Sequence, residues 1–214
     1  RMLHLFAPLI GLLAAPALSV CDLGKLSPVD FATQLHKSRL RDCLIEQTIF
    51  ITGKPLVDKY VRVPGRGPLR FGGVRLEHHR VLSVIGVTQG FSLSMANERS
   101  LEVVELDPKT GVAILSMNLN GSTVSKSTGK ITPGRVFFAI DEDKRLHRFV
   151  VSGRGQGGFG FYWRAEVRLP IGTPVFNARG QWVSLIALSA AGAGSYLLPQ
   201  RAFDEIVFTK ESSP

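Results

Sequence analysis

Residue types that could act as catalysts or metal ligands are few in this sequence and poorly clustered. The run Glu77–Arg80 (EHHR) holds two adjacent histidines. Neighbouring residues of a strand point to opposite faces, so these two imidazoles would not converge on one ion, and the run is better explained as a solvated hairpin tip. His36 and His147 are isolated from other ligand types along the chain. We therefore predict no metal site and no cofactor.

A glycine-rich run, Gly153–Gly160 (GRGQGGFG), contains the spacing G-x-G-x-x-G. A dinucleotide site needs a helix that begins at the last glycine, so that its N-terminus meets the pyrophosphate. Here Phe159–Trp163 (FGFYW) follows, which favours a strand. The run also imitates an Arg/Gly-rich RNA-binding stretch, but a single arginine before a tight aromatic run indicates a hairpin entering a buried strand.

Length and composition describe an ordinary globular chain with a basic surface. The 214 residues include 26 Lys+Arg against 17 Asp+Glu, a formal charge of +9, and 44% hydrophobic residues. This apolar content excludes a disordered tail or a long coiled coil, and the length favours one domain. Two cysteines exclude a disulfide-dense scaffold and a four-cysteine zinc site.

Residues 1–19 have the pattern of an export signal. Leu5–Ser19 (LFAPLIGLLAAPALS) carries no charge and is too short for the hydrocarbon core of a bilayer, and Ala17 and Ser19 precede a plausible cleavage site before Val20. The alternatives are an uncleaved apolar anchor and a buried helix. We predict an exported protein (periplasm, lumen or extracellular space), membrane-associated through this segment if it is retained.

The two cysteines allow three interpretations. Cys21 and Cys43 pair in an oxidising compartment, closing a loop of about twenty residues that would stabilise the fold by roughly 3 kcal/mol. Alternatively, Cys21 follows the apolar run closely enough to be lipid-modified, although Val20 fits that processing poorly. The third interpretation is two unpaired structural thiols.

The rest of the chain is a series of short strands after one helix. Ser27–Asp30 (SPVD) supplies an N-cap, a proline and an acidic first turn, and Phe31, Leu35 and Leu40 continue it as a loose apolar face. A dozen short strands at close spacing, with only terminal helices, indicate an all-β barrel or sandwich. The predicted strands are Cys43–Thr52, Leu69–Leu76, Arg80–Gly86, Phe91–Met95, Leu101–Leu106, Val112–Met117, Arg135–Ile140, Leu146–Ser152, Phe159–Val167, Thr173–Phe176, Gln181–Leu188 and Ser195–Leu198, before a closing helix over Pro199–Phe208.

Basic residues are concentrated before and within the first strands. Seven of them stand against only Asp58 and Glu77, a local excess of five: Lys54, Lys59, Arg62, Arg66, Arg70, Arg75 and Arg80. Such a face could bind an acidic protein partner or an anionic membrane surface, or it could simply keep the protein soluble. Export disfavours nucleic acid as a partner.

Four segments in the same order resemble trypsin-like serine proteases of the Deg/HtrA type. Val81–Val87 (VLSVIGV) is similar to their I-L-T-N-x-H-V strand, and Leu101–Met117 to the stretch that ends in D-P-x-x-D-L-A-V-L. Leu169–Val183 resembles G-N/D-S-G-G-P-L-x-N-x-x-G-x-V, and Ser195–Pro199 (SYLLP) resembles the final strand. The resemblance implies two six-stranded antiparallel β-barrels with short N- and C-terminal helices, and we expect the family's PDZ module to be absent.

The resemblance places the three catalytic positions at residues that lack the required groups. The histidine, aspartate and serine positions are Gly86, Gly111 and Ile171, separated by 25 and 60 residues. Thr173 and Ser83 are nearby hydroxyls, but no histidine is predicted close to them. A triad needs all three groups, so we expect no enzyme and no catalytic residues, that is, an inactive pseudoprotease.

These observations predict the following organisation and function. Residues 1–19 form the signal peptide or anchor, 20–42 an N-terminal extension with a helix, 43–208 the double barrel, and 209–214 a tail. We expect a non-catalytic accessory subunit or interaction scaffold that holds protein partners in an exported or membrane-associated assembly. The alternatives are a peptide-binding chaperone or protease regulator that uses the substrate-like cleft, and an active serine hydrolase.

Overall fold

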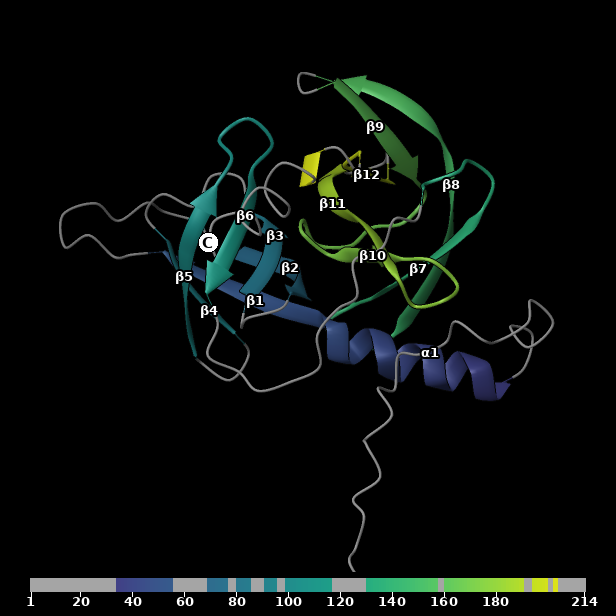
Figure 1. Ribbon diagram of the computed structural model, residues 1–214, viewed down its shortest axis with the longest axis horizontal. Helices are drawn as coiled ribbons and strands as arrows, with labels where there is room; N and C mark the ends of the chain where they lie inside the picture. Colours follow the sequence, from purple (N-terminus) through teal and green to yellow (C-terminus); the bar gives the residue numbers. More distant parts are fainter. Residues whose placement is uncertain are drawn as a thin grey trace, which may run out of the picture.

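The computed structural model describes residues 34–55, 69–76, 80–85, 91–95, 99–116, 130–157, 160–190, 194–199 and 202–203. They form one helix followed by twelve strands (Figure 1). The helix, α1, spans Gln34–Gln47. Figure 1 shows it running directly into the first strand and lying below the second group of strands.

The first six strands close into one antiparallel barrel. They are β1 (Thr48–Pro55), β2 (Leu69–Leu76), β3 (Arg80–Val84), β4 (Phe91–Met95), β5 (Ser100–Leu106) and β6 (Val112–Ser116). Their order around the barrel is β1-β2-β3-β6-β5-β4. Side chains alternate between the two faces of each strand, so one set of them points into the barrel. Ile51, Val81 and Leu115 belong to this core.

The last six strands close into a second antiparallel barrel. They are β7 (Val136–Ile140), β8 (Leu146–Gly157), β9 (Gly160–Ala165), β10 (Pro174–Phe176), β11 (Trp182–Ala190) and β12 (Gly194–Leu197). Their order is β10-β11-β12-β9-β8-β7, and Phe149, Val175 and Ile186 belong to the inner core. The glycine-rich run ends as predicted in a β8–β9 hairpin, with Gly157 opposite Gly160.

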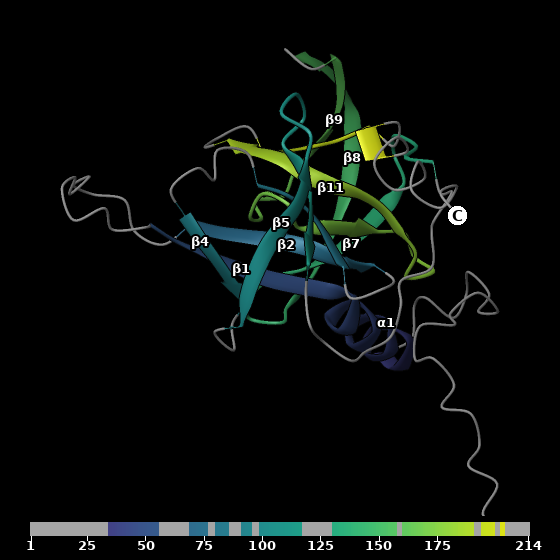
Figure 2. The ribbon, with the colours of Figure 1, turned by 60° about the vertical axis from the view of Figure 1, so that its left-hand side comes forward.

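A third core lies between the barrels and packs against α1. It joins Leu40 and Leu44 of the helix to Leu82 of the first barrel and to Phe176 and Leu185 of the second. Figure 2 shows the helix below the strands from another side. The predicted fold class, two six-stranded antiparallel barrels of the trypsin-like kind, is confirmed.

The strand predicted over Cys43–Thr52 begins five residues late, because the helix continues to Gln47. Leu40, Cys43, Leu44 and Gln47 are all buried, and their spacing of three and four residues places them on one side of a helix. Gln47 Nε2 also donates to Gly180 O at 3.2 Å, which fixes the end of α1 to the second barrel.

Several predictions fall wholly or partly outside the described residues. Of the closing helix predicted over Pro199–Phe208, residues 202 and 203 are helical and Phe203 is buried. The signal or anchor at residues 1–19 and the tail at 209–214 lie outside, so these boundaries stay predictions. In the described part of the chain, no helix is both long and apolar enough to cross a membrane.

Candidate functional site at the junction of the barrels

The turn that leads into β10 is hydrogen-bonded to both barrels. Ile171 O accepts from Gly72 N of β2 at 2.8 Å. On the other side, Gly172 N donates to Ile186 O of β11 at 2.7 Å, and Ile186 N donates to Thr173 O at 3.0 Å. These bonds hold residues 171–173 at a fixed place between β2 and β11.

Two of the three positions implied by the resemblance come together at the end of β3. Gly111 O accepts from Ile85 N at 3.0 Å, and Ile85 directly precedes Gly86, which lies outside the described residues. On the Ile171 side, a Cβ added to Gly172 would stand 3.0 Å from Val84 N. The junction of the barrels therefore brings the segments of Gly111 and Ile171 to the same strand end.

The side chains at this junction are mostly apolar or already hydrogen-bonded. Ile171 is half-buried and packs against both the inter-barrel core and the core of the first barrel. Ser83 Oγ is buried and donates to Gly72 O at 2.5 Å. Thr173 Oγ1 is buried with no hydrogen-bond partner in the structure. The junction thus holds two hydroxyl groups, of which only Ser83 is hydrogen-bonded.

The turn before Gly111 is built around one carboxylate. Asp107 accepts from Thr110 Oγ1 at 2.6 Å and from Lys109 N at 2.9 Å. The Thr110 hydrogen bond is the largest influence and, with the backbone donors, it lowers the pKa of Asp107 despite some burial. Gly111 then takes a φ of 73°, a left-handed conformation suited to glycine. Asp107 therefore sets the turn that delivers Gly111 to β3.

Beside the junction, half of β11 has no partner strand on its β10 side among the described residues. Within β11, the described residues of β10 pair only with Trp182–Leu185. Residues 187–190 therefore have no described ladder partner on the β10 side. Leu188 is 51% exposed there and lies opposite Tyr196 of β12. The ring of Tyr196 meets that of Tyr162 edge to face, with centroids 6.4 Å apart. The face of the sheet around Leu188 is therefore apolar and aromatic.

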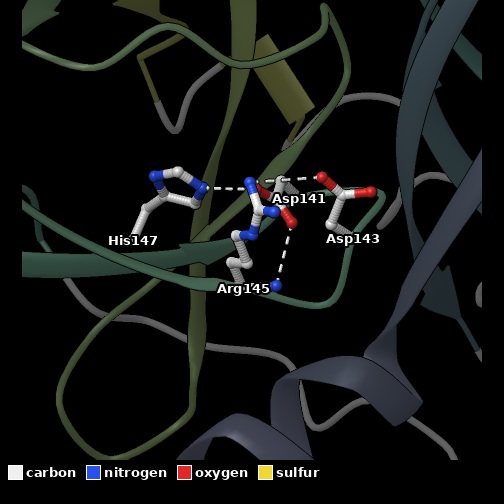
Figure 3. A network of polar contacts seen from close by, with 4 residues as sticks. All are labelled: Asp141, Asp143, Arg145 and His147. Carbon is white, nitrogen blue, oxygen red and sulfur yellow. Dashed lines mark hydrogen bonds and ion pairs between the residues drawn. The ribbon is translucent and has the colours of Figure 1, made fainter.

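A histidine that the sequence left isolated has a carboxylate partner. His147 Nε2 lies 2.7 Å from Asp141 Oδ2 across the β7–β8 turn, and Arg145 N donates to Asp141 Oδ1 at 2.8 Å (Figure 3). Arg145 also pairs with Asp143 at 3.3 Å. Burial raises the pKa of Asp141, but the bonds from His147 and Arg145 outweigh it and lower that pKa. The spacing of six residues across a tight turn is the signal that sequence reasoning missed.

This histidine–carboxylate pair provides an oriented imidazole close to the first barrel. The next residue of the turn, Glu142, lies 3.9 Å from Arg70 of β2. An imidazole held by a carboxylate is one part of a general-base arrangement. Among the described residues no hydroxyl or thiol is hydrogen-bonded to His147, so the pair by itself defines no reaction.

The predicted basic residues do not all share one face. Lys59, Arg62 and Arg66 lie outside the described residues. The other four are Lys54, Arg70, Arg75 and Arg80. Arg70 is exposed and bonds Thr52 Oγ1 at 3.0 Å. Because side chains alternate along β2, Arg75 points to the opposite face from Arg70, and it lies opposite Val81 of the barrel core.

Of the two cysteines, only Cys43 can be placed. It is fully buried on α1 and is disulfide-bonded. Cys21, the only other cysteine in the sequence, lies outside the described residues. The pairing of Cys21 with Cys43 therefore stays a prediction.

The two closed barrels and the junction between them define the trypsin-like fold. No protein-family model matches the sequence, and no curated protein is significantly similar to it. Solved structures are similar in fold, including the active form of the Rv3671c protease from M. tuberculosis, with a TM-score of 0.59 and 16% identity over 79% of this chain and 82% of that one. The inactive form of the Rv3671c protease gives a TM-score of 0.58 and 15% identity, over 80% and 93% of the two chains.

This likeness contradicts the prediction that the chain is not an enzyme. Both similar structures are those of a protease, one in its active and one in its inactive form. The fold is therefore one on which peptide hydrolysis takes place. Gly111 and Ile171 were assigned to the triad only through the resemblance. Their lack of catalytic side chains therefore does not establish that the chain is inactive.

Proposed function

We propose that the chain holds an extended polypeptide segment of a partner protein along the free side of β11. The observation that carries the proposal is the edge itself: Leu188 is 51% exposed on a half-strand with no described partner on the β10 side. A strand edge of this kind binds a segment through main-chain hydrogen bonds, and neighbouring side-chain surfaces select its residues.

The neighbouring surface favours an apolar residue in the bound segment. Tyr162 and Tyr196 are half-buried and meet edge to face, and Leu188 lies opposite Tyr196. Tyr162 also packs against the inter-barrel core together with Ala187 and Ile171. A side chain of the partner that contacts Leu188 would therefore meet an apolar and aromatic face.

An exported assembly is the setting we propose for this role. The apolar run at Leu5–Ser19 supports export. The disulfide at Cys43 supports an oxidising compartment, since structural disulfides persist there and are rare in the cytosol. The partner would then be an exported protein or an exposed segment of a membrane protein.

Binding can be tested with β-casein, an unfolded and acidic protein. Labelled casein is titrated with the full chain at nanomolar label concentration, and fluorescence anisotropy should show saturable binding of micromolar affinity. Leu188→Asp should weaken it at least about tenfold, because burying a leucine is worth roughly 1.5–3 kcal/mol. Mass spectrometry of the same samples shows whether the bound casein is cleaved.

Val150→Asp on β8 is the matched control, because Val150 is 42% exposed and lies opposite Val136 rather than on β11. It should leave casein affinity within about twofold of the unmodified chain, as expected of a surface substitution outside the contact. If casein does not bind, or if both variants weaken binding equally, the proposal for β11 is wrong.

A further inference from the structure

Strand β5 displays an apolar surface that its own barrel does not use. Val103 is 45% exposed, Val104 53% and Leu106 41%, and these are three of the five large exposed hydrophobic residues in the described part of the chain. The register explains them: Val103 pairs with Leu115 and Glu105 with Ile114, so Val104 is an extra residue in a bulge. A bulge re-aims the side chains beside it.

Two glutamates flank the two valines, on a chain whose net charge is positive. Glu102 is exposed and Glu105 is half-buried on either side of the two valines, while the whole chain carries +9. We call residues 102–106 the acidic stripe. Strand β6 pairs with the stripe on one side, whereas β4 pairs only with residues 100 and 101 of β5. The contact proposed below uses the side chains of the stripe.

The second barrel offers a surface of the opposite charge and similar apolar character. On the outer side of β8, Arg148 is exposed and Val150 is 42% exposed, two residues apart and therefore on the same face. Val136 of β7 is half-buried opposite Val150, and the exposed Arg135 precedes it. We call Val136, Arg148 and Val150 the basic face.

We propose that the acidic stripe of one molecule docks on the basic face of a second copy of this chain. Charge complementarity selects this occupant: molecules of net charge +9 repel one another, and the acidic stripe is a place where a basic copy is attracted. The valines of both surfaces would be removed from water on contact. Because the two surfaces differ, the contact is head-to-tail, and it builds a ring or an open chain of copies.

The test is the mass of the full chain in solution, measured by sedimentation velocity from nanomolar to high micromolar concentration. The unmodified chain should grow in mass with concentration, and added salt should reverse this growth. Glu102→Arg and Arg148→Glu should each raise the midpoint concentration of assembly about tenfold or more, since like charges then face each other.

The double variant Glu102→Arg/Arg148→Glu should restore assembly to within about threefold of the unmodified chain, which is the signature of a direct pair. Restored assembly also shows that neither substitution acts by unfolding the protein. The milder Val104→Thr, similar in shape but polar, should weaken assembly without changing the melting temperature. Glu46→Arg on α1, an exposed glutamate outside both surfaces, makes the same change of net charge and should have no effect.

Three results would overturn the proposal. A chain that stays monomeric at every concentration does not use a second copy as the partner of the stripe. Assembly that is unaffected by Glu102→Arg does not use the stripe. Assembly that is lost with Glu102→Arg but unchanged by Arg148→Glu uses the stripe against itself or another surface, not against the basic face.

Discussion

Gly172 is the residue at the barrel junction where an added methyl group is expected to cost most. Its φ is 79°, which L-residues other than glycine rarely adopt. An added Cβ would stand 2.2 Å from Gly72 O and 2.5 Å from Ser83 Oγ, closer than such atoms can approach. Gly172→Ala therefore meets both a backbone penalty and a steric one.

Three other glycines separate these two penalties. Gly134 has the same φ of 79° but nothing within 4 Å of an added Cβ, so Gly134→Ala carries the backbone penalty alone. For Gly72, an added Cβ would stand 2.4 Å from Thr173 Cα at an ordinary φ, so Gly72→Ala carries the steric penalty alone. Gly153 has neither, because nothing lies within 4 Å and its φ is ordinary.

The expected losses in the free energy of unfolding follow from the backbone penalty and the steric penalty. A left-handed alanine costs about 1–2 kcal/mol, and overpacking a close contact costs about 1–3 kcal/mol. Gly172→Ala should therefore lower the free energy of unfolding by about 2–5 kcal/mol, a large part of a total stability of roughly 5–15 kcal/mol. Gly134→Ala and Gly72→Ala should show one contribution each, and Gly153→Ala should lie within about 0.5 kcal/mol of the unmodified chain.

Urea unfolding followed by circular dichroism gives the free energies, and thermal scans should show about 2–4 °C per kcal/mol for a chain of this size. If Gly172→Ala is no more destabilising than Gly134→Ala, the backbone of β2 does not press on the turn at residues 171–173. The turn would then not be held tightly between β2 and β11. If Gly153→Ala also loses stability, the space around an added Cβ does not determine how these glycine substitutions change the free energy of unfolding.

Three further predictions concern the Asp141 carboxylate, the two cysteines and the buried hydroxyl of Ser184. The pKa of Asp141 is lowered from 3.8 in the folded protein, so its contribution to stability is present above that value and is lost as the pH falls further. Asp141→Asn should therefore be less stable than the unmodified chain at neutral pH, and the difference in melting temperature should narrow between about pH 5 and pH 2. Cys21→Ser and Cys43→Ser should each cost roughly 3 kcal/mol in urea unfolding, and the double variant should cost no more than either if the two residues pair. Ser184 Oγ donates to a buried carbonyl 2.7 Å away, so Ser184→Ala should cost about 1–3 kcal/mol in the same assay, since that acceptor loses its partner.

The strands were predictable because each barrel buries one face of every strand. Leu69–Leu76 and Phe91–Met95 were predicted with their observed bounds. The end of α1 was not predictable from local pattern, because residues 43–47 continue an apolar run that can be read as either strand or helix. The packing of Leu40 and Leu44 in the inter-barrel core stabilises the helix, and that packing exists only in the folded protein.

The candidate sites were less predictable, because they depend on contacts across turns and between barrels. His147 meets Asp141 only when the β7–β8 hairpin forms. The exposure of Val104 follows from a bulge that shifts the register against β6, and no residue pattern marks it. Within the predicted basic run, Arg70 and Arg75 lie on opposite faces of β2, because side chains alternate along a strand. Lys59, Arg62 and Arg66 lie outside the described residues, so the basic surface stays a prediction.

The turn at residues 171–173 connects the stability of the junction to the proposed binding edge. Gly172 N and Thr173 O hold Ile186 at 2.7 and 3.0 Å, and the part of β11 with no described partner on the β10 side begins at the next residue. A shift of this turn would therefore move the edge on which a partner segment is proposed to lie. Gly172→Ala should weaken casein binding even at temperatures where it remains folded, whereas Gly134→Ala, which pays the same backbone cost away from the turn, should not. Equal casein affinities for the two folded variants would mean that the position of β11 does not depend on this turn.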